Sequence, residues 1–467
     1  MGERALTRVL LVGSGAREHA IAVALAKSPN ADLYAAMSTN NPGITKLARE
    51  ATILQINDAR AVSDYAKGVH IELAVIGPEA PLVNGVVDFL AEEGIACVGP
   101  TQRLALLEGD KSFCRNLLSK YGIAGNPLFR VFTEPDSAEA FLRTAGPVAI
   151  KPAGLTGGKG VKVTGEDLPS KQDEVAYAKE ILRNKIGGSQ RLVIEERLNG
   201  EEYSLQGFVD GHDVHPMPLV QDHKRAYEND SGPNTGGMGS YSDRDHLLPF
   251  VSPENFEASF GAMADVIRAL NKETGEEYKG LLYGQFMLAR SLNEEKPSPK
   301  LIEFNCRFGD PEAMNVLPIL SEETDFMEVC ERIAEGSLKS KYFSFQPKAT
   351  VCKYLVPITY PDHVAAPQMV DVDEEAFGQN ARLFYAGVDV KNGCITTTGS
   401  RTLAVVGIAE TIREAEQIAE GATSNVQGPL RHRHDIGTEE LIQKRIEHMK
   451  SLGASTSTPS SPEMWIA

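Results

Sequence analysis

Residues 302–312 read Ile302-Glu303-Phe304-Asn305-Cys306-Arg307-Phe308-Gly309-Asp310-Pro311-Glu312, an alternating strand pattern followed by a polar turn. Because side chains alternate along a strand, Glu303 and Asn305 share one face and Ile302 and Phe304 the other. A carboxylate and an amide oxygen side by side suit a hard cation such as Mg2+. An edge strand with a solvated polar face fits the same pattern. The metal interpretation therefore depends on anion-binding motifs elsewhere in the chain.

Length, charge and cysteine spacing limit the number of domains and the class of protein. A chain of 467 residues is too long for one hydrophobic core, so we expect two to four domains. The net charge of −17 argues against coating nucleic acid or an anionic membrane. We see no signal peptide before the first strand pattern, and the six cysteines lack paired metal-type spacing. These features predict buried thiols and a cytoplasmic location.

Residues 8–100 alternate strand and helix patterns, which predicts a parallel, doubly wound α/β domain. Strands are expected at 8–12, 73–76 and 96–98, each ending in a turn rich in Gly or Pro. Ligands of such sheets bind beyond these strand ends. Gly13 and Gly15 resemble the start of a dinucleotide fingerprint, but Glu18 stands at the third glycine position. An anion at the helix N-terminus and a plain tight turn both remain open.

A glycine-rich hairpin is predicted at 148–161, where Lys151 precedes a loop containing Gly157, Gly158 and Lys159. Glycines let backbone N–H groups approach an anion, and the lysines supply charge. The segment does not match a Walker A loop, because strand rather than helix follows it. We interpret it as a flap over a triphosphate, with an ordinary hairpin loop as the alternative.

Two later segments carry further polar motifs. Residues 193–204 read as strand, turn and strand, and residues 195–198 offer backbone groups to an adenine edge, with an acidic side chain after them for ribose hydroxyls. The second segment combines 221–225 with the glycine-rich loop 232–239, beside Lys224 and Arg225. That combination suits phosphate or carboxylate recognition. The alternatives are ordinary acidic side chains on the surface for the first segment and a long surface loop for the second.

Taken in order, the motifs at 77–82, 107–111, 221–225, 232–239 and 302–312 resemble the phosphoribosylamine–glycine ligase family of the ATP-grasp superfamily. The resemblance covers about residues 8–440. It implies that ATP, glycine and 5-phosphoribosylamine give glycinamide ribonucleotide, ADP and phosphate in purine synthesis, through glycyl phosphate. The implied cofactors are ATP and Mg2+ or Mn2+. Transient handover of phosphoribosylamine from the enzyme that makes it is compatible with this assignment.

The resemblance also assigns site residues. The metal ligands that it implies are Glu303 and Asn305. Arg307 and Lys151 are our candidate catalytic cations, and we assign Arg307 to transition-state charge as a hypothesis. Nucleotide contacts are expected from Lys111, Lys151, Gly157, Gly158, Lys159, Glu195, Glu196, Arg197, Leu198 and Glu202. Substrate contacts are expected from Gly13, Gly15, Glu79, Lys224, Arg225, Asn234, Thr235, Gly236, Gly237 and Asp310.

Three positions differ from the family pattern or qualify it. Ala153 stands where the family has an aspartate before the flap, and Gln285 stands where a small residue is expected. Arg433-His434-Asp435-Ile436-Gly437 resembles the family's closing motif, so His432 and His434 are interpreted as structural rather than as metal ligands.

The predicted architecture has four parts: an N-terminal Rossmann-like domain (1–107), an ATP-grasp domain (108–335) with a flap subdomain at about 125–195, a smaller α+β domain (336–445) and a disordered tail (446–467). In the third domain we expect strands at 350–355, 383–390 and 402–408 and a helix over 411–422. The alternatives are a sister ATP-grasp ligase acting on another purine intermediate, a nucleotide-regulated binding protein, and an oxidoreductase using the first domain. The absent third glycine weakens the oxidoreductase.

Overall fold

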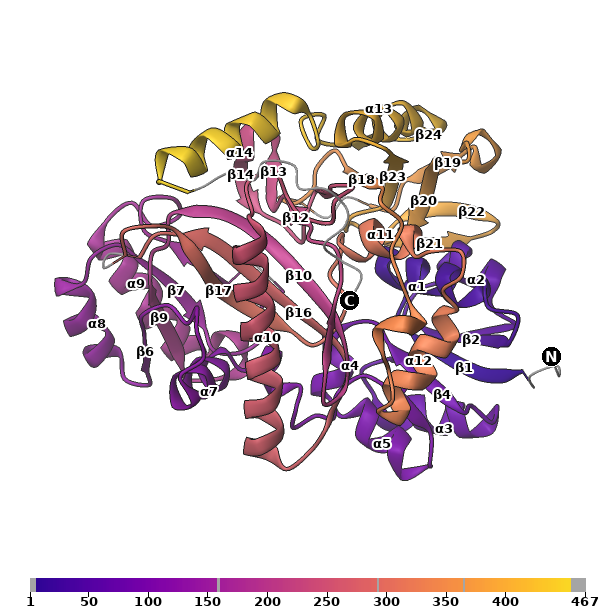
Figure 1. Ribbon diagram of the computed structural model, residues 1–467, viewed down its shortest axis with the longest axis horizontal. Helices are drawn as coiled ribbons and strands as arrows, with labels where there is room; N and C mark the ends of the chain where they lie inside the picture. Colours follow the sequence, from indigo (N-terminus) through magenta and orange to yellow (C-terminus); the bar gives the residue numbers. More distant parts are fainter. Residues whose placement is uncertain (1–5, 158–159, 292–293, 364–365, 455–467) are drawn as a thin grey trace.

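The computed structural model describes residues 6–157, 160–291, 294–363 and 366–454. Figure 1 places the N-terminal segment (indigo) at one end of the molecule and residues 129–196 (purple) at the other. Long central strands run between them, and the C-terminal segment (orange to yellow) lies along one side. No helix within the described residues is long and apolar enough to cross a membrane.

The N-terminal part is a parallel five-stranded sheet, which confirms the predicted doubly wound α/β fold. Its elements are β1 (Thr7–Val12), α1 (Ala16–Ala26), β2 (Ala31–Met37), α2 (Pro42–Leu47), β3 (Glu50–Ile53), α3 (Ala59–Gly68), β4 (Leu73–Ile76), α4 (Glu79–Val83), α5 (Val86–Glu92) and β5 (Ala96–Val98). The strand order is β3-β2-β1-β4-β5. Right-handed crossovers then place α1 and α2 on one face and α3 and α5 on the other, and each pair is in contact.

Two strands of this sheet, β2 and β3, were not identified from the sequence. The β3 segment Glu-Ala-Thr-Ile is short and lies at the sheet edge, where it is only partly buried. It therefore lacks the continuous apolar run that marks β1 and β4 as central parallel strands.

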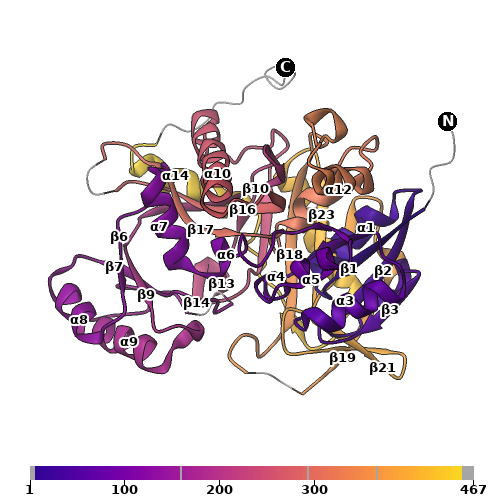
Figure 2. The ribbon, with the colours of Figure 1, turned by 90° about the horizontal axis from the view of Figure 1, so that it is seen from below.

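The central part contains two antiparallel sheets. Its elements are α6 (Leu106–Gly109), α7 (Lys111–Tyr121), β6 (Phe129–Phe132), α8 (Pro135–Thr144), β7 (Val148–Pro152), β8 (Lys162–Val163), α9 (Lys171–Asn184), β9 (Leu192–Glu196), β10 (Gly200–Gly211), β11 (Val214–Pro216), α10 (Pro253–Thr274), β16 (Tyr278–Ala289) and β17 (Ser298–Asn305). The smaller sheet, β6-β9-β7-β8, has its own core with α8 and α9 and lies far from the N-terminal sheet (Figure 2). The larger sheet is β11-β10-β16-β17, and α10 packs against it.

The C-terminal sheet includes two strands from the middle of the chain. Its order is β12-β15-β18-β23-β20, so residues 239–242 pair with a strand more than a hundred residues later, and residues 221–222 join the sheet beside them. The remaining elements are β12 (Gln221–Asp222), β13 (Arg225–Tyr227), β14 (Ser231–Asn234), β15 (Gly239–Ser242), α11 (Ala313–Val316), α12 (Phe326–Glu335), β18 (Ala349–Pro357), β19 (Met369–Val372), β20 (Ala381–Tyr385), β21 (Val388–Lys391), β22 (Cys394–Thr397), β23 (Leu403–Ala409), α13 (Ile412–Ala422), β24 (Val426–Gln427), β25 (Leu430–Arg431) and α14 (Glu439–Ser451). This exchange holds the predicted substrate loop 232–239 against the C-terminal part.

Two predictions for this region were wrong. The single strand expected at 383–390 is two strands, because β20 joins the large sheet while β21 pairs with β22. The tail predicted to be disordered from residue 446 begins with ordered helix, since α14 continues to Ser451. Leu441 and Met449 are buried on α14, and this apolar packing holds the last turns in place.

Candidate active site

One cavity of about 870 Å3 lies where the three parts of the chain meet. Cationic and anionic side chains line it in nearly equal number, although the whole chain carries a net charge of −17. The predicted site residues that line it are Glu79, Lys111, Lys151, Gly157, Glu195, Glu196, Arg197, Leu198, Glu202, Lys224, Arg225, Asn234, Thr235, Gly236, Glu303, Asn305, Arg307 and Asp310. The fold therefore gathers motifs that are scattered along the sequence around one space.

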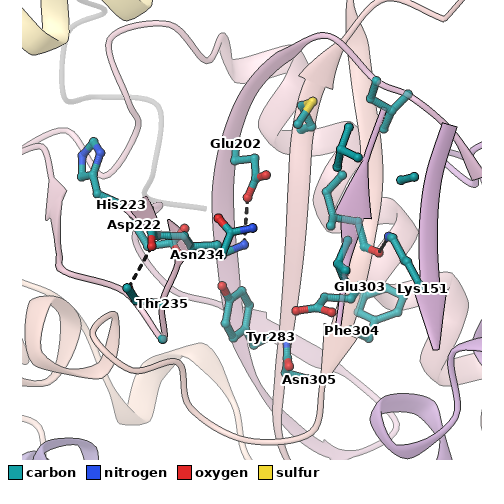
Figure 3. A pocket seen from close by; sticks show the side chains of 18 of the residues that line it. Lys151, Glu202, Asp222, His223, Asn234, Thr235, Tyr283, Glu303, Phe304 and Asn305 are labelled. Atoms are coloured by element: carbon teal, nitrogen blue, oxygen red, sulfur yellow. Dashed lines mark hydrogen bonds and ion pairs between the residues drawn. The ribbon is translucent and has the colours of Figure 1, made fainter. Parts of the chain in front are cut away.

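The end of β17 places Glu303 and Asn305 in this cavity (Figure 3). The pairing of β16 with β17 slips by one residue, because Gln285 lies opposite Glu303 and Phe286 opposite Leu301. This bulge interrupts the regular alternation expected from the sequence and directs the Ile302 carbonyl toward Lys151, whose Nζ donates to it at 3.2 Å.

The Glu303 carboxylate makes no hydrogen bond or ion pair with any described residue. Burial opposes its ionisation, but Lys111, Lys224, Lys151 and Arg307 together lower its pKa. Asn305 Oδ1 beside it accepts from Arg307 Nη2 at 3.3 Å. An ionised, unpaired carboxylate next to an amide oxygen is a donor set that fits a hard divalent cation.

Lys151 belongs to a buried ionic cluster with Glu195 and Arg115. Glu195 accepts from Lys151 Nζ at 2.8 Å and from Arg115 Nε at 2.7 Å. Burial disfavours the Glu195 carboxylate, but the two cations lower its pKa to about 2. The side chain of Glu195 thus holds two cations at the cavity wall. In the same segment the Glu196 and Arg197 N–H groups donate to the Leu128 and Pro147 carbonyls, at 2.9 and 3.1 Å.

A second charged group includes Glu202 and Lys224. Lys224 Nζ lies 2.8 Å from Glu202 Oε2, and Gln285 Nε2 donates to Glu202 and to Asp222. Gln285 is completely buried, so the unexpected residue at this position orders two acidic side chains rather than projecting into the open cavity.

Lys111 begins α7, and its backbone N–H donates to the Ala153 carbonyl at 2.7 Å. Gly158 and Lys159 lie outside the described residues.

Arg307 lies between two carboxylates, Glu79 and Glu108, at 3.3 Å from each. Burial raises the pKa of Glu108 to about 7, although Arg307 opposes this shift. The Cys306 N–H also donates to Glu108 at 2.7 Å. The guanidinium is therefore held in a fixed orientation at the end of the metal-ligand strand.

The hairpin of β13 and β14 is clamped by cations from the C-terminal part. Arg433 donates to the Arg225 carbonyl and to Asp230, and Arg445 of α14 also binds Asp230. Arg401 Nη1 donates to the carbonyls of Gly236, Gly237 and Asp310, at 2.7 to 3.0 Å. The C-terminal part thus supports the 225–237 loop and the turn at Asp310.

Gly13, Gly15 and Gly237 do not line the cavity. The Glu18 carboxylate accepts from the Gly15 N–H at 2.6 Å and from Arg17 Nε at 2.6 Å. A Cβ at Gly13 would lie 2.5 Å from Glu18 Cγ, so this glycine makes room for the carboxylate. The helix N-terminus that the sequence offered to an anion is filled by the chain's own side chain.

Several cavity residues were not among the predicted site residues: Arg17, Glu108, Arg115, Asp222, Glu312, Arg401, Lys444, Arg445 and His448. Glu108, Asp222 and Glu312 lie within motifs already identified in the sequence, so these three residues could have been predicted from those motifs. Arg401, Arg445 and His448 come from segments without a concentrated polar motif, and only the tertiary fold brings them here.

Three family models match successive parts of the chain: phosphoribosylglycinamide synthetase N domain at residues 7–108, its ATP-grasp (A) domain at 109–313 and its C domain at 350–439. A relative from Methanosarcina barkeri named phosphoribosylamine–glycine ligase is 50% identical over 446 residues, covering 95% of this chain and 99% of the relative. A relative of the same name from Methanocaldococcus jannaschii is 49% identical over 451 residues, covering 95% of this chain and 99% of the relative.

Solved structures agree with this assignment. The Thermotoga maritima phosphoribosylamine–glycine ligase superposes with a TM-score of 0.76 at 27% identity, covering 92% of this chain and 100% of that one. The biotin carboxylase domain of Hydrogenobacter thermophilus 2-oxoglutarate carboxylase gives a TM-score of 0.69 at 16% identity, covering 96% of this chain and 94% of that one, and so shares the fold. The matches to all three domain models and to relatives of nearly full length establish that this chain belongs to the phosphoribosylamine–glycine ligase family of ATP-grasp proteins.

Proposed function

We propose that this protein uses ATP to join glycine to 5-phosphoribosylamine, giving glycinamide ribonucleotide, ADP and phosphate in purine synthesis. The names of its nearly full-length relatives support the reaction. The observation that carries it is the Glu303 carboxylate, which has no hydrogen-bond or ion-pair partner among the described residues. It lies beside Asn305 and in the field of Lys111, Lys151, Lys224 and Arg307. That arrangement combines cation ligands with charge for a polyphosphate.

Glu303 and Asn305 are the residues we assign to a divalent cation, with Mg2+ expected and Mn2+ as an alternative. Both supply oxygen donors, and the low pKa of Glu303 keeps its carboxylate available. When bound, the cation would neutralise phosphate charge and orient the transferring group.

The chain's own cations are assigned to the phosphoryl transfer. A carboxylate oxygen of glycine attacks the γ-phosphorus of ATP, ADP leaves, and glycyl phosphate is formed. Lys111, Lys151 and Lys159 neutralise the polyphosphate, while Arg307, fixed by Glu79 and Glu108, stabilises charge that develops in the transition state. The backbone of residues 195–198 and the Glu202 carboxylate are proposed to contact adenine and ribose.

The second step forms the carbon–nitrogen bond. The amine of phosphoribosylamine attacks the acyl carbon, phosphate leaves, and the nitrogen loses one proton. Asn234, Thr235, Gly236, Asp310, Lys224 and Arg225 are proposed to bind the substrates, supported by their place in the cavity. The glycine-rich hairpin covers the nucleotide and limits hydrolysis of the acyl phosphate.

Gly13, Gly15 and Gly237 are proposed to act indirectly. The first two accommodate Glu18, and Gly237 presents a carbonyl to Arg401. A direct contact between a substrate phosphate and the Gly15 N–H requires Glu18 to move away first.

We place the reaction in the cytoplasm, in keeping with six cysteines that are all free thiols. We also propose that phosphoribosylamine is handed over by the enzyme that makes it, because this amine is short-lived. A scavenger of free phosphoribosylamine added to the coupled reaction tests the handover. Product that still forms at the same rate supports it, and product that disappears contradicts it.

The assay that tests the function measures ADP release with ATP, Mg2+ and glycine, with and without phosphoribosylamine generated from ribose 5-phosphate and ammonia. Release that needs both co-substrates supports the ligase. Release with another carboxylate but not with glycine keeps the ATP-grasp chemistry and overturns the substrate. Release without any carboxylate points to a nucleotide-hydrolysing or regulated binding protein.

A further inference from the structure

A second group of metal-ligand side chains lies outside the cavity, where the last turn of α13 faces the segment after β25. Glu420, His432 and His434 each offer one donor atom, and these atoms all lie within 4.8 Å of one another. His432 Nε2 is 3.2 Å from both Glu420 oxygens, and His434 Nδ1 is 2.6 Å from Oε1. The two imidazole rings are 4.2 Å apart between centroids.

The local backbone explains why the histidines converge. Residues two apart in an extended segment point to the same side, so His432 and His434 face Glu420 while Arg433 points away. Arg433 instead donates to the Arg225 carbonyl and to Asp230 in the β13–β14 hairpin. The same three-residue segment therefore has one face at this cluster and the other at the substrate hairpin.

The charges around the cluster tolerate an added cation. The Lys353 ammonium lies 2.6 Å from Glu416 and 2.5 Å from Glu420, so two carboxylates surround one ammonium. Lys353 competes for one oxygen of Glu420 but leaves the other turned toward the histidines.

We propose that Glu420, His432 and His434 bind a late first-row divalent cation, with Zn2+ as the representative ion and water in the remaining positions. Two imidazoles and one carboxylate form a donor set that Zn2+ uses in proteins. Nitrogen donors discriminate against Mg2+, so this site is chemically distinct from the oxygen site at Glu303 and Asn305. The sequence alone favoured a structural role for both histidines, and the convergence on Glu420 is what changes that assignment.

Occupation of the site joins α13 to the 432–434 segment. Because Arg433 holds the β13–β14 hairpin, we expect bound Zn2+ to stabilise this part of the fold as well. The effect on thermal unfolding provides a readout that does not depend on enzyme activity.

The test is calorimetric titration of the tag-free full-length protein with Zn2+ in the presence of excess Mg2+, together with Co2+ absorption spectra. We expect one Zn2+ per chain, and the double variant His432→Gln/His434→Gln should bind at least roughly tenfold more weakly. The matched control is His212→Gln, which removes a histidine that faces a single carboxylate, Glu277, at 3.5 Å. A second control, Glu303→Gln, alters the cation site proposed in the cavity and so distinguishes Zn2+ binding there from binding at the histidines. Neither control variant should change the affinity for Zn2+.

The Zn2+-dependent rise in melting temperature should be present in the wild type and in both controls and absent in the double variant. Equal Zn2+ affinity in the wild type and the double variant would overturn the proposal, as would a wild type that takes up no Zn2+. In either case the three side chains are a hydrogen-bonded cluster and nothing more.

Discussion

Glu166 accepts a hydrogen bond from Arg225 Nη2 at 2.6 Å and joins the loop after β8 to the β13–β14 hairpin. Arg197 reaches the other oxygen of the same carboxylate at 3.2 Å. All three residues line the cavity, so this contact links the nucleotide side of the site to the substrate side.

We expect Glu166→Gln to weaken this link without abolishing activity. The Glu166 side chain is 43% exposed, so the ion pair contributes about 1 kcal/mol or less, equivalent to a fall in kcat/KM of about fivefold at most. The fall should shrink as salt is added. Glu139→Gln, which changes the ion pairs of Glu139 with Arg143 and Lys179 outside the cavity, should leave kcat/KM unchanged. A salt-independent loss of several hundredfold in Glu166→Gln would show that the residue acts directly on a substrate.

Arg307→Lys tests the proposed role of the guanidinium. Lysine keeps the positive charge between Glu79 and Glu108 but loses the rigid fork that Arg307 presents. If Arg307 stabilises the transition state, kcat falls by about 100-fold or more while the melting temperature changes little. Full turnover with only a higher KM for one substrate would assign Arg307 to binding instead.

Glu303→Gln tests the cation site in the cavity. The amide retains an oxygen but removes the negative charge, so half-maximal activity should require a much higher Mg2+ concentration. Because the four nearby cations lower the pKa of this carboxylate, its ionised form favours the folded state, and we also expect the variant to lose some free energy of unfolding at pH 7. A variant with the wild-type Mg2+ dependence would move the cation site away from β17.

The pKa of Glu195 leads to a prediction about stability and pH. Its pKa is about 2 in the folded chain and about 4.5 as an ordinary glutamate, so its ionised form favours the folded state above pH 4.5 and loses that effect as pH falls. Glu195→Gln leaves Arg115 and Lys151 buried without their partner and should cost about 3–5 kcal/mol at pH 7.

Urea unfolding of the ligand-free protein at pH 7 and at pH 4 measures this difference. We expect the difference in the free energy of unfolding between wild type and Glu195→Gln to be smaller at pH 4 than at pH 7. The control is the neighbouring variant Glu196→Gln, which keeps an oxygen that accepts from the Leu128 N–H. Its free energy of unfolding should be close to that of the wild type at both pH values. A gap that widens as pH falls would contradict the assigned sign.

The sequence was informative wherever a functional side chain lies within a local pattern. Alternation over residues 301–305 predicted β17, and its polar face identified Glu303 and Asn305. It could not predict the bulge at Ile302, because that depends on the register with β16. Nor could it connect Arg401 with Gly236, which lies 165 residues earlier, since no local periodicity records a contact at that separation.

The occupied turn at Gly15 shows a second limit. Gly13-x-Gly15 before a helix is a pattern that indicates anion binding, and the structure does contain an anion there, the Glu18 carboxylate. The motif predicts that backbone N–H groups at this turn bind an anion. It does not predict whether that anion is a ligand or a side chain of the protein.

Transfer of 18O from glycine labelled in its carboxylate tests the central claim most directly. If the protein activates glycine as glycyl phosphate, one labelled oxygen leaves with the γ-phosphoryl group, and mass spectrometry finds singly labelled phosphate in amounts equal to the glycinamide ribonucleotide formed. Unlabelled phosphate alongside normal product formation would contradict the account.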